Sequence, residues 1–206
     1  MVGDFRDLGV GPKHPKNPNL PNSSLQGGFL ANSGYHYLTT YMLATVIYDL
    51  TVEFCGKFLS SREYLRIREQ MVQAGRSGRQ NIAEGYEEKS LQSYIKLVGV
   101  ADASLEELLL DYQDYLRQRK LSIWSKEDPK IRAFRDFRVV WIDENTLNTP
   151  NLPNDPTEAA NLLITLIAQA TFLLAKQIKA LEEKFIAEGG YRENLFKKRM
   201  DRRQNS

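Results

Sequence analysis

The stretch from Gln70 to Gly85, QMVQAGRSGRQNIAEG, carries three glycines and two arginines within sixteen residues. Glycines interleaved with cations are typical of loops that cradle phosphate, because backbone N–H groups and a basic side chain then contact one anion. Glycines are also typical of a helix that needs small residues where a neighbouring helix passes closely. The first interpretation predicts a nucleotide enzyme, and the second predicts a packed helical protein that binds a partner.

The phosphate-loop interpretation fails on context and on spacing. No strand pattern precedes the glycines, and GRSGRQ matches neither the P-loop nor the dinucleotide-binding spacing. A helical seam runs through the stretch at intervals of three and four residues: Ile67, Met71, Ala74, Gly78 and Ile82. Gly75 and Gly78 each cost a helix about 1 kcal/mol relative to alanine. We therefore expect both to face a neighbouring helix at a short backbone distance.

The end of this stretch holds three further residues with an expected structural role. Gly85 follows the last turn of the seam, which predicts a left-handed residue that ends the helix. Asn81 and Glu84 lie one turn apart, and we expect both to hydrogen-bond the backbone of the turn that starts the next helix. A binding role for this polar pair is the alternative.

Residue types that perform catalysis are few. The only histidines are His14 and His36, and no Glu-x-x-His pair or zinc-ligand spacing occurs. The single cysteine, Cys55, lies in an apolar helical pattern, which favours a buried inert thiol over a nucleophile. We therefore expect no catalytic residue, no metal and no cofactor, and hence no enzyme.

Basic side chains offer the remaining chemistry. Arg68, Arg76 and Arg79 fall within an arc of about 80° on one predicted helix, and residues 189–206 hold six basic against two acidic residues. A phosphate-binding stripe reinforced by the basic tail is one interpretation. The other is a solvated face whose arginines pair with the acidic helix 90–119. The candidate nucleic-acid contacts are Arg68, Arg76, Arg79, Lys197, Lys198, Arg199, Arg202 and Arg203.

Helices must position all of these residues, because no competing strand pattern is present. Apolar spacing predicts long helices over 38–59, 61–84, 90–119 and 156–188, in antiparallel up-down-up-down order, and a short helix over 129–139. Ser90 and Asp155 are the expected N-caps. Gly189 and Gly190 are expected to stop the last long helix. The predicted fold class is therefore an all-α four-helix bundle.

Composition divides the chain into three parts. Residues 1–34 are rich in Gly, Pro and Asn and predict an irregular arm. Residues 35–188 form the predicted bundle, with an insertion at about 120–155, and residues 189–206 form a basic tail expected to be mobile. No signal peptide and no membrane span are expected. A lone cysteine fits a reducing compartment, so the expected location is the cytoplasm.

Three segments together resemble the bacterial four-helix bundle protein family, which includes proteins encoded in ribosomal RNA intervening sequences and the retroelement accessory variability determinant. They are IYDLTVEF (47–54), QMVQAGRSGRQNIAEG (70–85) and LVGVADASLEELLLDYQDYLRQR (97–119). Residues 161–196 look like the subgroup with a four-helix-bundle suffix domain. The resemblance covers roughly residues 35–200.

The resemblance implies a homo-oligomer, a ring-like pentamer, with no established enzymatic activity. It also implies that basic surfaces bind RNA or DNA and that a reverse transcriptase is a partner in a diversity-generating retroelement. The Pro-rich arm, the insertion and the basic tail depart from the short members of the family. Apolar side chains off the main seams, such as Tyr37, Tyr41 and Phe172, favour subunit contacts. Two functions therefore stay open, a nucleic-acid-binding accessory protein and a protein-binding scaffold.

Overall fold

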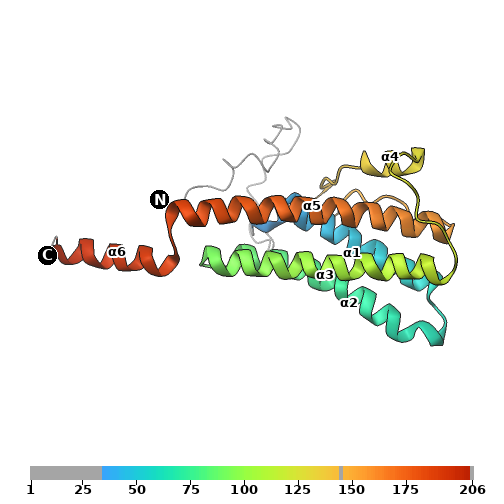
Figure 1. Ribbon diagram of the computed structural model, residues 1–206, viewed down its shortest axis with the longest axis horizontal. Helices are drawn as coiled ribbons and strands as arrows, with labels where there is room; N and C mark the ends of the chain where they lie inside the picture. The colour runs from blue at the N-terminus through green and yellow to red at the C-terminus, as the bar shows by residue number, and fades with distance from the viewer. Residues whose placement is uncertain (1–33, 144–145, 205–206) are drawn as a thin grey trace.

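The computed structural model describes residues 34–143 and 146–204, and most of these residues lie in helices (Figure 1). The elements are η2 Gly34–Tyr37, α1 Thr39–Phe58, η3 Arg62–Tyr64, α2 Leu65–Glu87, α3 Leu91–Gln118, α4 Pro129–Arg135, α5 Pro156–Glu188 and α6 Tyr191–Gln204. Among the described residues the only strand-like pairing is an isolated bridge between Trp141 and Leu147. The predicted all-α class is confirmed. Of the arm predicted over residues 1–34, residues 1–33 lie outside the described residues.

Local capping sets the helix ends where the sequence predicts them. The Ser90 hydroxyl accepts from the Ser93 N–H at 3.1 Å and starts α3. The Asp155 carboxylate accepts from the Glu158 N–H at 2.8 Å and starts α5, with Pro156 in the first turn. Gly189 has a φ of 78° and ends α5. These side-chain caps satisfy N–H groups that have no partner within the helix.

The predicted end of α2 is wrong, because the helix continues through Gly85 to Glu87. Gly189 is the only glycine with positive φ in the described residues, so Gly85 is not a left-handed stop. Its small size serves packing instead. A Cβ atom on Gly85 would lie 2.9 Å from Cδ2 of Tyr94 and 3.2 Å from Cβ of Leu97. Gly85 is therefore needed where α2 approaches the first turns of α3.

The predicted basic tail contains a helix that the sequence pattern was not used to assign, because residues 191–204 form α6. This helix buries none of its residues. Figure 1 shows α6 continuing beyond the end of α5 and away from the other helices. Arg, Lys, Glu, Leu and Met are good helix formers, and the segment contains neither Gly nor Pro. Local propensity thus makes a helix here without tertiary packing.

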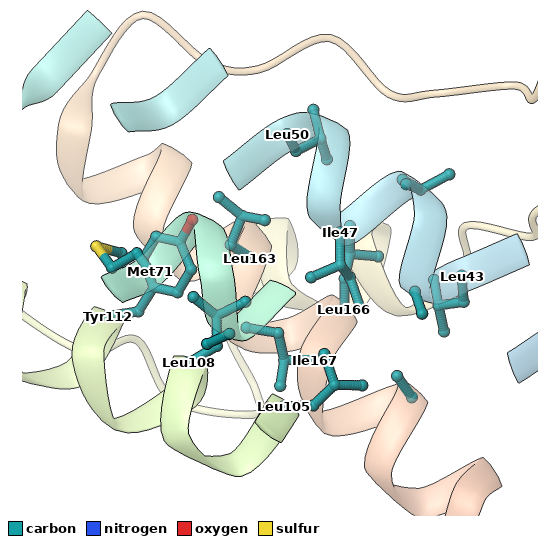
Figure 2. Packing of buried hydrophobic residues seen from close by; sticks show 14 of the residues in the cluster. Leu43, Ile47, Leu50, Met71, Leu105, Leu108, Tyr112, Leu163, Leu166 and Ile167 are labelled. Atoms are coloured by element: carbon teal, nitrogen blue, oxygen red, sulfur yellow. The ribbon is translucent and has the colours of Figure 1, made fainter. Parts of the chain in front are cut away.

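The core lies between four long helices whose contacts close a circuit. Helix α2 packs on α1 and α3, and α5 packs on α1 and α3. Figure 2 shows how the apolar seams meet, with α1 contributing Leu43, Ile47 and Leu50, α2 Met71, α3 Leu105, Leu108 and Tyr112, and α5 Leu163, Leu166 and Ile167. Short α4 packs on α5, so five helices pack together. Removing these side chains from water is the main stabilising term of the fold.

The buried threonine, asparagine and glutamine side chains of this core are hydrogen-bonded. The Thr40 hydroxyl donates to Gln177 Oε1 at 2.8 Å, and Gln177 Nε2 donates to the Tyr94 hydroxyl at 2.8 Å. This chain of bonds joins α1, α5 and α3. Elsewhere the fully buried Tyr112 hydroxyl donates to Thr51 Oγ1 at 3.0 Å. Buried polar groups cost stability unless they are paired, so these bonds favour one register of the helices.

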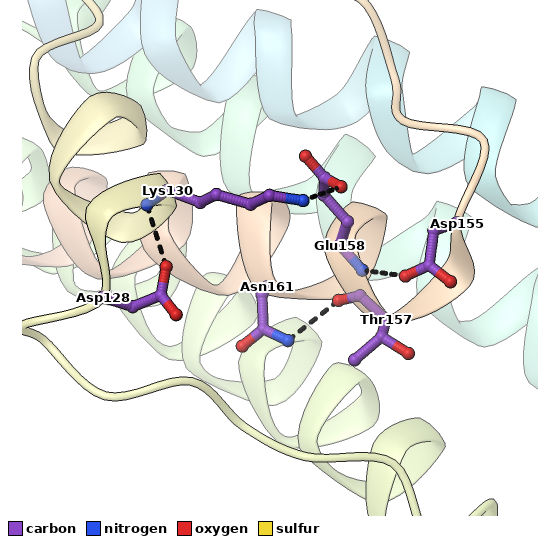
Figure 3. A network of polar contacts seen from close by, with 6 residues as sticks. All are labelled: Asp128, Lys130, Asp155, Thr157, Glu158 and Asn161. Carbon is purple, nitrogen blue, oxygen red and sulfur yellow. Dashed lines mark hydrogen bonds and ion pairs between the residues drawn. The ribbon is translucent and has the colours of Figure 1, made fainter.

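The segment between α3 and α5 is held against α5 by polar contacts (Figure 3). Buried Asn161 accepts from the Trp124 N–H at 2.9 Å and donates to the Ser122 carbonyl at 3.0 Å. The Lys130 ammonium on α4 pairs with the Glu158 carboxylate. The short helix predicted over 129–139 ends at Arg135, and the residues after it are irregular. The insertion is therefore fastened to the first two turns of α5.

By length and composition alone, the helical run from Pro156 to Gln204 could cross a membrane. Its most apolar window is, however, 56% buried inside the fold. The apolar character of α5 is thus explained by its central place in the core, where helices are hydrophobic on most sides.

Candidate nucleic-acid interface

Two arginines of the predicted stripe, Arg68 and Arg79, interact with residues of α1. Arg68 and Arg79 are half-buried, whereas Arg76 is exposed. The Arg79 guanidinium lies over the ring of Tyr48 on α1, 4.6 Å from its centroid. Partial burial raises the pKa of Asp49 on α1, and nearby Arg79 lowers it in part. Only Arg76 therefore presents its charge fully to solvent.

Pairing of these arginines with acidic α3 is not found among the described residues. The α3 carboxylates have other neighbours: Asp114 pairs with Arg117 of its own helix at 2.9 Å, and Glu107 accepts from Gln70 on α2 at 3.3 Å. The helix geometry explains this, because the arginines lie about 80–160° around α2 from Gly78, which faces α3. The described residues therefore do not show the ion pairs with α3 that the alternative interpretation expected. Arg79 instead has an aromatic and an acidic neighbour on α1, Tyr48 and Asp49.

The second basic group lies on α6. Its five predicted residues, Lys197, Lys198, Arg199, Arg202 and Arg203, are all exposed, and so is Arg192. At 100° per residue, five of the six basic side chains of α6 fall within an arc of about 140°. A hollow lined by Arg192, Glu193, Phe196 and Lys197 opens beside the start of the helix. This arrangement suits a polyanion, because cations on one helix side can follow a row of phosphates.

The two basic groups do not form one site. Helix α6 extends beyond the end of α5, whereas α2 lies against α1 and α3 (Figure 1). The predicted contacts therefore separate into an α2 group, with Arg76 as its exposed member, and an α6 group.

Gly75 and Gly78 lie where α2, the helix that carries the stripe arginines, packs on its neighbours. A Cβ on Gly78 would lie 2.7 Å from Cδ2 of Leu105, and one on Gly75 would lie 3.6 Å from the Tyr48 Cα. Helix α2 thus approaches α3 through Gly78 and α1 through Gly75. Both glycines face a neighbouring helix as expected, but only Gly78 lies too close to its neighbour to admit a Cβ, because the contact at Gly75 would be an ordinary van der Waals one.

The predicted role of the polar pair is wrong. Asn81 Nδ2 donates to the Ser77 carbonyl at 2.9 Å and lies 3.1 Å from the Ser77 hydroxyl. That hydroxyl is 2.9 Å from the Ser104 hydroxyl on α3. Glu84 is exposed and makes no hydrogen bond to the start of α3 within the described part of the chain. Because α2 continues past Gly85, the turn that these side chains were expected to cap begins later.

Other reactive groups in the described residues do not build a site. Cys55 is buried, and burial raises the pKa of its thiol to about 12, so it is protonated and unreactive at neutral pH. His36 stacks on Tyr35 and lies near Trp141, whose indole N–H donates to the His36 carbonyl at 2.9 Å. No group of three potential metal ligands occurs in residues 34–143 and 146–204. His14 lies outside the described residues.

Two features of the surface are missed by reasoning from the sequence. Tyr48 supports Arg79, but an aromatic residue on another helix gives no local signal of that contact. Arg192 belongs to the α6 surface, and its helical phase with Arg199 would have revealed it had residues 191–204 been interpreted as a helix. The absence of Gly and Pro from that segment was the available signal.

Comparisons with protein-family models, with curated proteins and with solved structures found no match to this chain.

Proposed function

We propose that the chain is a non-enzymatic, oligomeric helical protein that binds RNA or DNA through the basic surface of α6. One observation carries this proposal. Six basic side chains stand on a 14-residue helix that buries nothing and projects from the packed helices. Because α6 buries no residue, packing on the other helices contributes little to its stability. Neutralising phosphates, by contrast, releases counterions and favours binding.

The proposal includes the arrangement and kinship suggested by the sequence. The four long helices form an antiparallel up-down-up-down bundle of the bacterial four-helix bundle protein family, assembled as a ring-like homopentamer in the cytoplasm. The circuit of contacts among α1, α2, α3 and α5 supports the bundle. The family motifs support a role as accessory protein to a reverse transcriptase. A reverse transcriptase gene next to this one, and co-purification of the two proteins, would test that partner.

Binding is tested with nuclease-treated protein and labelled RNA and DNA, single- and double-stranded, starting at about 50 mM salt, where counterion release is most favourable. The logarithm of affinity should fall with the logarithm of salt, with a slope near −0.9 per contact for duplex DNA and about −0.7 for single strands. Deleting residues 197–206 should weaken binding and flatten this slope. No binding to any of the four probes would refute the proposal.

The α2 group is tested separately. Arg76→Gln should reduce affinity by a small factor if α2 contributes to the contact, since it removes one exposed charge. Ala83→Gln, on the same side of α2, is the matched control because it changes surface shape without removing charge. An unchanged salt slope in Arg76→Gln would confine the interface to α6.

A protein-binding scaffold is the second candidate. It is favoured by large apolar side chains that remain exposed on several helices, including Leu110, Phe172 and Ile186. The two functions differ in salt dependence, because apolar contacts do not weaken as salt rises.

A further inference from the structure

Helices α3 and α6 each carry, on an exposed face, a leucine flanked by two charged residues of the same sign. On α3, Leu110 is 61% exposed, with Glu107 three residues before it and Asp114 four residues after it. On α6, Leu195 is 44% exposed, with Arg192 three residues before it and Arg199 four residues after it. Each triplet falls within an arc of about 60° on its helix. The spacing is the same, and the charges are opposite.

Both triplets are accessible. Helix α6 buries no residue, and the side chain of Asp114 is 56% exposed. Asp114 accepts two contacts from Arg117, and both go to Oδ1. A carboxylate has about four acceptor sites on its two oxygens, so Asp114 can accept another guanidinium while it keeps Arg117.

We propose that α6 of one copy docks alongside α3 of a second copy. Leu195 packs against Leu110, Arg192 pairs with Glu107, and Arg199 pairs with Asp114. The residues match in order only when the two helices run parallel, because the leucine is offset toward the first charge in both triplets. An apolar contact flanked by opposite charges is how paired helices select partner and register.

The helix cannot reach this face of its own chain. Gln177 lies level with Tyr94, since the two side chains are hydrogen-bonded. Gly189 lies 12 residues beyond Gln177, or about 18 Å along α5 at 1.5 Å per residue. Folded straight back, α6 would span about 22 Å and end about 4 Å past Tyr94. Leu110 lies 16 residues beyond Tyr94, or about 24 Å along α3. A second molecule is therefore required.

This contact uses part of the basic surface proposed for nucleic acid, because Arg192 and Arg199 belong to both. Lys197 lies about 160° around α6 from Leu195 and faces away from the docked helix. Lys198, Arg202 and Arg203 lie closer to the triplet of Arg192, Leu195 and Arg199. They stand beside it or follow Arg199 along the helix. Docking is therefore measured on nuclease-treated protein without added nucleic acid, so its failure would not be a failure of the proposed function.

The test is disulfide trapping between two full-length variants, Leu110→Cys and Leu195→Cys, mixed in equal amounts under mild oxidation. Native Cys55 stays silent because it is buried. We expect a cross-linked species of twice the chain mass that contains one copy of each variant. The matched control replaces Leu195→Cys by Lys197→Cys on the opposite side of α6. Its yield should be about tenfold lower, because disulfides form only between Cα atoms within about 7 Å.

Charge reversal sharpens the result. Adding E107R and D114R to the Leu110→Cys copy should lower the yield about tenfold, because both attractive contacts become repulsive. Adding R192E and R199E to the other copy should restore it. All four positions are exposed, and circular dichroism verifies that each variant is folded.

Three outcomes would overturn the proposal. They are equal trapping by Leu195→Cys and Lys197→Cys, no recovery when both charge sets are reversed, and an intramolecular disulfide in a dilute chain that carries both leucine-to-cysteine changes. The last would show that α6 folds back on its own α3.

Discussion

Helices α2 and α6 are both basic, yet their charges stand in different surroundings. In α2, two of the three stripe arginines are half-buried, and Arg79 rests on the Tyr48 ring of a neighbouring helix. In α6, every basic side chain is exposed, and the helix makes no extensive contact with another described helix. The same residue type therefore contributes to packing in one helix and to surface charge in the other. Net charge counted along a sequence does not separate these two uses.

The largest expected effect concerns the packing that embeds α2. Gly78→Leu should lower the free energy of unfolding by about 3 kcal/mol or prevent folding, because the new side chain overpacks the crossing with α3. Even a Cβ atom at residue 78 would lie within 3 Å of the Leu105 side chain. The change is measured by denaturant or thermal unfolding.

Gly99→Leu on α3 is the matched control, since a Cβ there meets no atom within 4 Å. It should leave stability unchanged or raise it by up to about 0.8 kcal/mol through helix propensity. Equal midpoints for Gly78→Leu and wild type would show that α2 is not tightly packed, and the contrast with α6 would be lost.

The second effect concerns buried polar groups, which α6 lacks. Gln177→Leu should destabilise the fold by about 2 kcal/mol, because it removes one acceptor and one donor from the buried chain between Thr40 and Tyr94. Gln92→Leu, at an exposed position on α3, serves as control and should change stability little. Similar unfolding curves for the two variants would mean that the bonds add no net stability.

The third effect compares arginines directly. Arg79→Gln should cost about 0.5–1 kcal/mol of stability, since it removes the cation from the Tyr48 ring. Arg203→Gln on α6 should leave the melting temperature unchanged and weaken nucleic-acid binding instead. Melting and binding are measured on the same preparations. A pattern in which Arg203→Gln destabilises the protein would contradict the division between packed and exposed charge.

The smallest effect is a pH dependence of α3. Burial, reinforced by nearby Glu107 and Asp114, raises the pKa of Asp111 to about 6. One of its oxygens is buried with no hydrogen-bond partner among the described residues. In the unfolded chain an aspartate titrates near 4. Because the folded pKa is the higher one, this group's contribution to stability is fully present below about pH 4 and is lost as pH rises through about 6.

Asp111→Asn should therefore flatten the stability profile between about pH 4 and 6 and raise the melting temperature at pH 7 by about 1–2 °C, a shift kept small by partial exposure. Thermal melts across that range measure it. Glu106→Gln, at an exposed site on the same helix, is the control. A profile unchanged by Asp111→Asn would show that the carboxylate is solvated.

Much of the helical framework was predictable because its signals are local. The seam spacing and the caps at Ser90 and Asp155 depend on a few neighbouring residues, and the predicted helix 156–188 has the bounds of α5. The close packing at Gly78 was also predictable, since glycine in the middle of a seam has a cost that tight packing offsets.

The remaining features depend on contacts between segments far apart in sequence. Gly85 looks like a helix stop, and only the position of Tyr94 on α3 shows that it serves packing. The direction of the α2 arginines depends on which helix lies beside them. The helix within the predicted basic tail, residues 189–206, was missed for another reason, because high charge was weighed above the good helix propensity of its residues.

The hydrogen bond between Thr40 and Gln177 joins residues 137 positions apart. A ribosome adds about 5–20 residues per second. The nascent α1 therefore waits about 7–27 s for its partner on α5. During that interval α1, α2 and α3 can pair with one another, but the apolar face that later receives α5 stays open to other chains and to chaperones.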